Sequence, residues 1–135
     1  MHLGTFPLAH LGLRVGDLAR ARRFYIDTLG FTLIRETPTA VFMDAHGLLI
    51  ALLGASEQMD AADRFDPFRV GLDHLALAIA DAGELKGLRD QLDAACVPNH
   101  GIEPDPATGA SYISFYDPDG IAWELYAVPT PRPPQ

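Results

Sequence analysis

Two histidines and one glutamate, His10, His74 and Glu124, stand in segments whose polar and apolar residues alternate as in β-strands. Because successive side chains of a strand point to opposite faces, all three lie away from the bulky apolar residues, among small or polar neighbours. Two neutral imidazoles and one carboxylate can bind a divalent metal and leave coordination positions open to water or substrate. A metal held in this way polarises a bound oxygen. The sequence therefore predicts one metal site.

The ordinary alternative for either histidine alone is a buried imidazole bonded to the backbone. Two features favour ligation. His10 and His74 occupy the same place in two similar parts of the chain. Burial of the Glu124 carboxylate in a strand is costly without a partner, and a bound cation removes that cost.

The chain consists of two similar halves. His10-Leu-Gly-Leu-Arg-Val parallels His74-Leu-Ala-Leu-Ala-Ile, and Gly47-Leu-Leu-Ile-Ala51-Leu parallels Gly120-Ile-Ala-Trp-Glu124-Leu. The offset grows between these two pairs, which predicts insertions in the second half, at about 99–109. The alignment places Ala51 where the second half has Glu124. Such a repeat is a strong architectural signal.

Each half follows the order strand, helix, strand, strand, strand. In the first half we expect strands over 8–15, 31–35, 40–44 and 48–53, with a helix between the N-cap Asp17 and Gly30. In the second we expect strands over 72–80, 101–103, 112–116 and 121–127. Its helix carries a stripe of apolar residues and opens with a capping box of Asp81 and Glu84. The dipeptide His46-Gly47 and the segment 117–120 (Asp-Pro-Asp-Gly) read as turns.

Length and composition exclude several classes of protein. A chain of 135 residues, 48% apolar and 21% charged, is long enough for one globular domain. The net charge of −8 and a single lysine, Lys86, argue against nucleic-acid binding and suit a neutral or cationic small ligand. No apolar run reaches the roughly 18 residues of a membrane span, and no secretory signal is visible. One cysteine, Cys96, fits a reducing cytoplasm and is expected to be a small buried side chain.

The combined pattern resembles the vicinal oxygen chelate superfamily, which includes glyoxalase I, extradiol dioxygenases, fosfomycin-resistance proteins and bleomycin-binding proteins. The resemblance covers about residues 10–127. The motifs that carry it are His10-Leu-Gly-Leu-Arg-Val, Phe24-Tyr25 with Leu29-Gly30-Phe31, Asp73-His74-Leu-Ala-Leu, and Asp117-Pro-Asp-Gly-Ile-Ala-Trp-Glu124-Leu.

This resemblance implies an α+β fold with two βαβββ modules in tandem, which form a curved mixed sheet around a cup-shaped site. The chain is then a single domain over 1–135, with modules at about 7–54 and 72–128, a connector at 55–71 and a loose tail at 129–135. It also implies that His10, His74 and Glu124 hold one divalent ion (iron, zinc, nickel, cobalt or manganese). We expect a homodimer, because an incompletely closed sheet leaves edges to cover. The site is completed either within one chain or between two.

The chain departs from each subfamily in an informative way. Glyoxalase I-like proteins often have a carboxylate ligand where this chain has Ala51. Extradiol dioxygenases have an acid–base histidine before the second ligand, but residues 55–73 contain none. They also have a tyrosine near the position of Ser114, and here Tyr112 lies two residues away on the same face. Fosfomycin-resistance proteins use basic residues late in the chain, and none occurs between Arg89 and Arg132.

The first hypothesis for function is a metal-dependent enzyme that acts on a small oxygenated organic molecule, either as a lyase or isomerase or as a ring-cleaving dioxygenase. Glu124, Tyr112 and Ser114 are the candidate catalytic residues. His100 lies either in a loop near the site or exposed away from it. The second hypothesis is a non-catalytic protein of the bleomycin-resistance type that sequesters a drug-like ligand. No glycine-rich phosphate loop indicates an organic cofactor.

Overall fold

The computed structural model describes residue 4 and residues 6–128, and the predicted loose tail lies outside these residues. The chain divides into two compact units, Met1–Asp63 and Arg64–Gln135. The division falls within the segment 55–71 that the sequence predicts to be a connector. The described residues 54–74 contain no helix or strand. Each unit is therefore treated by itself.

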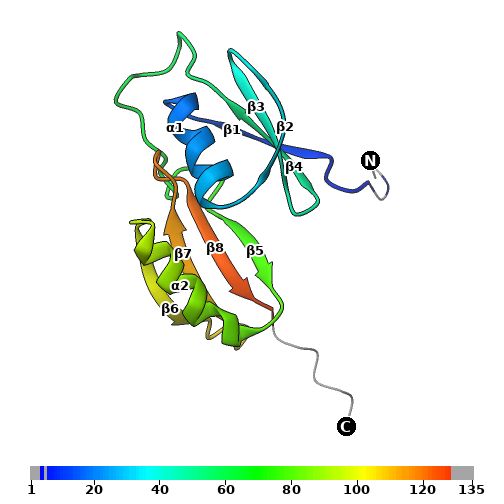
Figure 1. Cartoon of the computed structure of the whole chain (residues 1–135), viewed down its shortest axis with the longest axis vertical. Coiled ribbons are helices and arrows are strands. Elements are labelled where there is room, and N and C mark those ends of the chain that lie inside the picture. Colours follow the sequence, from blue (N-terminus) through cyan, green and yellow to red (C-terminus); the bar gives the residue numbers. More distant parts are fainter. Residues whose placement is uncertain (1–3, 5, 129–135) are drawn as a thin grey trace. The chain divides into compact units, whose positions relative to one another are not determined.

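The first unit is a four-stranded sheet with one helical segment (Figure 1). Its elements, in chain order, are β1 (His10–Arg14), α1 (Leu18–Arg22), η1 (Arg23–Thr28), β2 (Thr32–Thr37), β3 (Ala40–Ala45) and β4 (Leu48–Leu53). The predicted helix is present, but its second half is a π-helix, which the apolar spacing alone did not indicate. The Asp17 side chain caps α1 by accepting a hydrogen bond from the Arg20 amide at 2.9 Å, as predicted.

The second unit repeats this plan. Its elements are β5 (Leu75–Ile79), η2 (Ala82–Glu84), α2 (Leu85–Ala94), β6 (Asn99–Pro104), β7 (Ser111–Tyr116) and β8 (Ala122–Ala127). The prediction of a capping box formed by Asp81 and Glu84 was wrong in detail. The Asp81 carboxylate accepts from the Gly83 amide at 2.8 Å, one residue earlier than a capping box requires, because the segment opens as a 3₁₀ turn.

The two sheets have the same topology and register, so the tandem βαβββ arrangement is confirmed. Their strand orders are β1-β4-β3-β2 and β5-β8-β7-β6, with the first pair parallel and the others antiparallel. Gly12 pairs with Ala51 in the first sheet, and Ala76 pairs with Glu124 in the second. This register confirms that Ala51 is the counterpart of Glu124. The longer hairpin connection of the second unit lies at 105–110, at the end of the region where insertions were expected.

Both predicted turns are present. His46 and Gly47 have φ values of 55° and 100°, which join β3 and β4 in a tight hairpin. At the start of β8, the buried Asp117 carboxylate accepts hydrogen bonds from the Asp119 amide at 2.9 Å and the Ile121 amide at 2.7 Å. This turn fixes the residue at which β8 begins.

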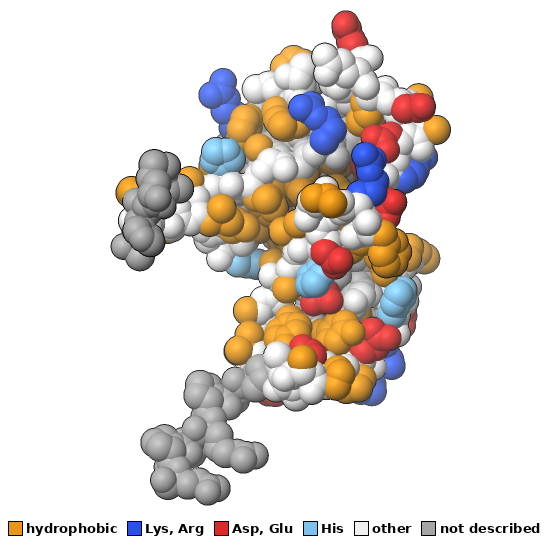
Figure 2. Space-filling view, turned by 180° about the vertical axis from the view of Figure 1, so that it is seen from behind, with side chains coloured by type: hydrophobic (Ala, Val, Ile, Leu, Met, Phe, Trp, Pro, Cys, Tyr) orange, Lys and Arg blue, Asp and Glu red, His pale blue; other side chains and the backbone are white. Residues whose placement is uncertain are grey.

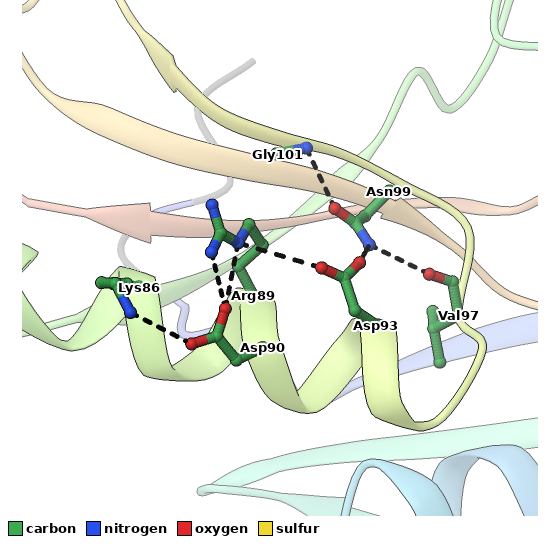
Figure 3. Close-up of polar contacts among 7 residues, drawn as sticks. All are labelled: Lys86, Arg89, Asp90, Asp93, Val97, Asn99 and Gly101. Carbon is green, nitrogen blue, oxygen red and sulfur yellow. Dashed lines mark hydrogen bonds and ion pairs between the residues drawn. The ribbon is translucent and has the colours of Figure 1, made fainter.

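Polar side chains connect the end of α2 to β6 (Figure 3). The Asn99 amide donates to the Asp93 carboxylate at 2.8 Å and to the Val97 carbonyl at 3.1 Å. Its own oxygen accepts from the Gly101 amide at 3.0 Å. These bonds hold the start of β6, an edge strand of the second sheet, at the end of α2.

Cys96 lies two residues after Ala94, the last residue of α2. The expectation that this cysteine is buried was wrong. Its side chain is exposed and its φ is 55°. The Val97 amide bonds to the Leu92 carbonyl at 2.9 Å and the Cys96 amide to the Asp93 carbonyl at 3.0 Å. These two bonds are a Schellman motif, in which the position of Cys96 favours glycine. The motif turns Cys96 outward and buries Val97 instead.

Cys96→Gly should therefore stabilise the protein by about 1 kcal/mol, because glycine adopts a left-handed backbone without the steric cost of a β-carbon. Urea unfolding measures this change in the free energy of unfolding. Cys96→Ala is the matched control, since it removes the thiol but keeps the β-carbon, and it should give no comparable gain. An equal gain in both variants would attribute the effect to the thiol rather than to the backbone.

No helix in the described part of the chain is long and apolar enough to cross a membrane.

Candidate functional site

Strand alternation gives the second sheet one apolar face and one polar face. Ile113, Phe115 and Trp123 are at most 2% exposed, and they lie on the face that α2 packs against (Figure 1). The side chains between them are half-buried on the other face. Figure 2 shows the second unit from behind, where acidic side chains and histidines gather among apolar ones. This polar face carries Glu124, Tyr112 and Ser114, as the alternation predicts.

Glu124 lies in the middle of the polar face and has small neighbours. Ser114 is directly opposite on β7, and Ala76 is opposite on β5. The Glu124 side chain is only 16% exposed. Burial raises the pKa of its carboxyl group, while the neighbouring His74 acts to lower it. Glu124 is therefore a largely buried carboxylate among small side chains.

His74 directly precedes β5, rather than lying within the strand as predicted, and its ring reaches Glu124. The His74 Nε2 atom is 3.4 Å from Glu124 Oε2. The other ring nitrogen, Nδ1, lies 2.6 Å from the Asp73 carboxylate. Because an ionised carboxylate cannot donate, the Nδ1 proton belongs to the imidazole. The His74 ring therefore lies between two carboxylates, those of Asp73 and Glu124.

A positive charge at Nε2 favours this contact with Glu124, and it is supplied either by a proton on His74 or by a bound cation. The distance of 3.4 Å is compatible with both. Two ligand atoms at about 2.1 Å from one ion, at angles between 90° and tetrahedral, lie about 3.0–3.4 Å apart. The contact with Asp73 is also the usual arrangement of a metal-binding histidine, whose other nitrogen donates to a carboxylate. His74 and Glu124 therefore offer two donors of a kind that suits a divalent metal.

His10 belongs to the other unit, where it begins β1 and is exposed. It pairs with Leu49, two residues before Ala51, just as His74 precedes the Ala76–Glu124 pair. Ala51 is buried and offers no ligand atom. Among the residues that the structure describes, no group of three or more His, Cys, Asp or Glu side chains able to hold a metal ion is found.

The other two predicted residues flank Glu124 on β7. Ser114 is opposite it, and Tyr112, opposite Tyr126, is in the next pair on the same face. Burial raises the pKa of the Tyr112 phenol, with further contributions from the charge of Glu103 and a hydrogen bond to it. Tyr112 therefore remains a protonated hydrogen-bond donor at neutral pH.

The structure adds side chains that the sequence interpretation did not assign to the site. Asp73 was quoted only as part of a motif, although an acidic residue next to a candidate ligand histidine could have indicated its role. Tyr126 was not among the candidate residues. Its hydroxyl donates to Asp105 at 2.7 Å. Because 20 residues separate Asp105 and Tyr126 in the chain, no local sequence pattern indicates this contact.

His100 lies on β6, not in a loop, and is exposed. Its Nε2 atom is 3.2 Å from the Tyr116 hydroxyl, and the two ring centroids are 5.4 Å apart. Tyr116 pairs with Ala122, one pair before Ser114 and Glu124 on the same face. The structure thus places His100 beside the end of the polar face.

Asp73→Asn should weaken the binding of zinc about 10-fold, because the His74 ring would lose the carboxylate that orients it and raises its basicity. Competition with a chromophoric chelator measures this affinity. Asp66→Asn is a suitable control, since it also removes a charge from an exposed aspartate of the same unit but does not contact a candidate ligand. Equal affinities of the Asp73→Asn protein and the wild type would rule out an orienting role for Asp73.

Comparisons with known proteins agree with this fold. The sequence model of the Glyoxalase/Bleomycin resistance protein/Dioxygenase superfamily matches residues 8–125. The chain is 31% identical to the protein YaeR of Escherichia coli (strain K12), over 92% of this chain and 98% of that protein. It is 26% identical to the solved glyoxylase/bleomycin resistance protein/dioxygenase domain from Frankia sp. EAN1pec, with a TM-score of 0.77, over 93% of this chain and all of that domain.

Two further relatives are named for an activity. The chain is 32% identical to biphenyl-2,3-diol 1,2-dioxygenase 3 of Rhodococcus globerulus, over 90% of this chain and 63% of that enzyme. It is 30% identical to lactoylglutathione lyase of Oryza sativa subsp. japonica, over 93% of this chain and 45% of that enzyme. The tandem modules, their shared register and the match over residues 8–125 lead to one conclusion: the chain belongs to the glyoxalase/bleomycin resistance protein/dioxygenase superfamily.

Proposed function

We propose that the chain is a metal-dependent enzyme that acts on a small organic molecule through two neighbouring oxygens. The observation that carries this proposal is the approach of His74 to Glu124 on the polar face, where His74 Nε2 and Glu124 Oε2 are 3.4 Å apart. That distance suits two ligands of one ion. The orientation of His74 by Asp73 supports it further.

In this proposal His10, His74 and Glu124 hold the metal, and Asp73 orients His74. The bound ion would supply Lewis acidity toward the substrate oxygens. Tyr112 donates a hydrogen bond from its neutral phenol toward the oxygen on which negative charge develops. Ser114, opposite Glu124, orients the substrate over the small side chains of the polar face.

The reaction is either of the lyase or isomerase type or of the ring-cleaving dioxygenase type. Ala51 supports a three-ligand site over a four-ligand one, because it occupies in the first sheet the place of Glu124 in the second. Two histidines and one carboxylate with open positions are the ligand set of non-haem iron oxygenases, and zinc, nickel or cobalt sites can use the same residues. The metal that the protein retains therefore separates the two types.

Elemental analysis of protein purified without a metal-affinity tag tests the proposal. We expect about one equivalent of a divalent metal for each complete site. An iron protein is then assayed for oxygen-dependent cleavage of biphenyl-2,3-diol, and a zinc, nickel or cobalt protein for lactoylglutathione lyase activity. A protein that binds none of these ions after incubation with each would contradict the metal site. The non-catalytic ligand-sequestering function would then be favoured.

The source of His10 is tested by complementation. We propose a homodimer of single-domain chains in a reducing cytoplasm, with His10 contributed either by the same chain or by its partner. Copies carrying His10→Ala are unfolded, mixed with copies carrying His74→Ala and refolded together. If the site forms across chains, the mixture regains metal binding that neither variant shows alone. If the site forms within one chain, the mixture binds no more metal than either variant alone.

A further inference from the structure

Tyr126 lies beside both residues that the proposed function assigns to substrate. It is two residues after Glu124 on β8, and on the same face. Across the sheet it pairs with Tyr112, and the next pair on the same face is Ser114 with Glu124. Tyr126 is therefore a direct cross-strand neighbour of Tyr112.

The Tyr126 hydroxyl is bound to the connection between β6 and β7. It donates to Asp105 Oδ2 at 2.7 Å, and the Thr108 hydroxyl donates to the same oxygen at 2.7 Å. The two hydroxyl oxygens are also within hydrogen-bond distance of each other. Since this hydroxyl is engaged by the protein itself, Tyr126 is not placed to donate to a ligand.

The connection that Tyr126 holds is compact. The Asp105 amide bonds to the Ala110 carbonyl at 2.8 Å, and the Gly109 amide bonds to the Asp105 carbonyl at 2.8 Å. The Ala107 amide donates to Asp105 Oδ1 at 2.9 Å. Asp105 thus organises residues 105–110 and also receives the bond from β8, so Tyr126 fixes the whole connection to the sheet.

The ring of Tyr126 lies against that of Tyr112. Their centroids are 6.2 Å apart and their planes differ by 21°. Glu103 pairs with Tyr112 from the other side, on β6. The Tyr112 ring is therefore held between Glu103 and Tyr126, in the strand that follows the connection 105–110.

From these contacts we infer that Tyr126 is a positioning residue of the site: its ring orients Tyr112, and its hydroxyl anchors the 105–110 connection beside it. The link between Tyr126 and substrate binding rests on the proposed function. The contacts of Tyr126 with Tyr112 and with the connection are independent of that function. Tyr126 acts through Tyr112 and is not itself a catalytic residue.

Tyr126→Phe tests the inference, because it keeps the ring and removes the hydroxyl. In the metal-free full-length protein we expect hydrogen exchange of the amides within residues 106–110, those of Ala107, Thr108, Gly109 and Ala110, to accelerate about 10-fold, which corresponds to the loss of one hydrogen bond of ordinary strength. In ¹³C-tyrosine-labelled protein, the Tyr112 ring signal should shift or broaden. Tyr116→Phe is the control, since its hydroxyl contacts His100 and not the connection.

The second measurement is the affinity of 4-nitrocatechol, a coloured vicinal dioxygen ligand, for the zinc-loaded protein. Tyr126→Phe should keep the zinc stoichiometry and weaken nitrocatechol about 5-fold. In a double-mutant cycle, Tyr112→Phe should weaken nitrocatechol in the wild type and have much less effect in Tyr126→Phe. A purely stabilising role of Tyr126 would leave the Tyr112→Phe effect unchanged.

The inference is overturned if exchange in 106–110 and the Tyr112 signal are the same in Tyr126→Phe and the wild type. It is also overturned if the effects of Tyr112→Phe and Tyr126→Phe on nitrocatechol are independent. If the wild type binds neither zinc nor nitrocatechol, the proposed function fails instead. The exchange and ring measurements then still decide whether Tyr126 holds Tyr112 and the connection.

Discussion

Glu124→Ala should weaken the binding of divalent metal at least about 100-fold, or about 2.7 kcal/mol, because it removes the one charged ligand of the proposed set. His74 would remain with its Nε2 atom facing a vacant position instead of a carboxylate 3.4 Å away. Metal titration and elemental analysis measure this loss. Glu103→Ala is the control, since it removes a carboxylate from β6, two strands away from β8 in the same sheet. Equal losses in the two variants would indicate non-specific charge attraction.

In the metal-free protein, by contrast, replacement of Glu124 by glutamine should increase the free energy of unfolding. Burial raises the pKa of Glu124 above 4.5, so its ionised form costs stability in the absence of a cation. This cost is fully present above the raised pKa and disappears as the pH falls through it. Glu124→Gln should therefore stabilise the metal-free protein at pH 7, and the gain should vanish in acid. Thermal unfolding over this pH range measures it. A destabilised Gln variant at pH 7 would show that Glu124 has a stabilising partner within the protein.

Asp117→Ala should destabilise the protein by about 2–4 kcal/mol, because it leaves two buried amides, those of Asp119 and Ile121, without their acceptor. The turn also determines where β8 begins, and with it the pairing of Glu124 with Ser114. Urea unfolding gives the free energy, and zinc titration of the folded protein tests the pairing. Both stability and metal affinity should fall.

Asp66→Ala is the matched control for this turn. The Asp66 carboxylate accepts from the Phe68 amide at 2.9 Å in an exposed turn of similar local form. Water can replace an acceptor there, so its loss should cost less than about 1 kcal/mol. Asp117→Asn retains an acceptor oxygen and should recover part of the stability. If Asp117→Ala and Asp66→Ala lowered the free energy of unfolding by the same amount, burial of Asp117 would have no energetic role.

The sequence was sufficient for the fold because its signals were local and repeated. Alternation of apolar and polar residues predicted that Glu124 lies away from the bulky apolar side chains, and in the structure it lies on the face opposite the buried Trp123. Alignment of the halves predicted the Ala51 counterpart of Glu124, which the strand register confirms. The π-helix from Arg23 to Thr28 was missed because α- and π-helices bury similar stripes of residues over so short a segment.

The site was less predictable because its supporting contacts join distant residues. The hydroxyl of Tyr126 reaches Asp105 through a hairpin whose geometry no local pattern specifies. Cys96 was placed inside because cysteine is a small apolar side chain, but the end of α2 required a left-handed residue and turned it outward. The predicted ligands His10, His74 and Glu124 and the candidates Tyr112 and Ser114 remain proposals that the variants above will test.

The shared register of the two sheets has a consequence for how metal sites of this kind can change over generations. Ala51 stands in the first sheet where Glu124 stands in the second, and each follows a histidine at the start of a neighbouring parallel strand. Every alanine codon is one base away from a codon for aspartate or glutamate. A lineage can thus gain or lose an acidic side chain at position 51 in one mutational step. In the proposed site, the number of acidic ligands can therefore change while the fold stays constant.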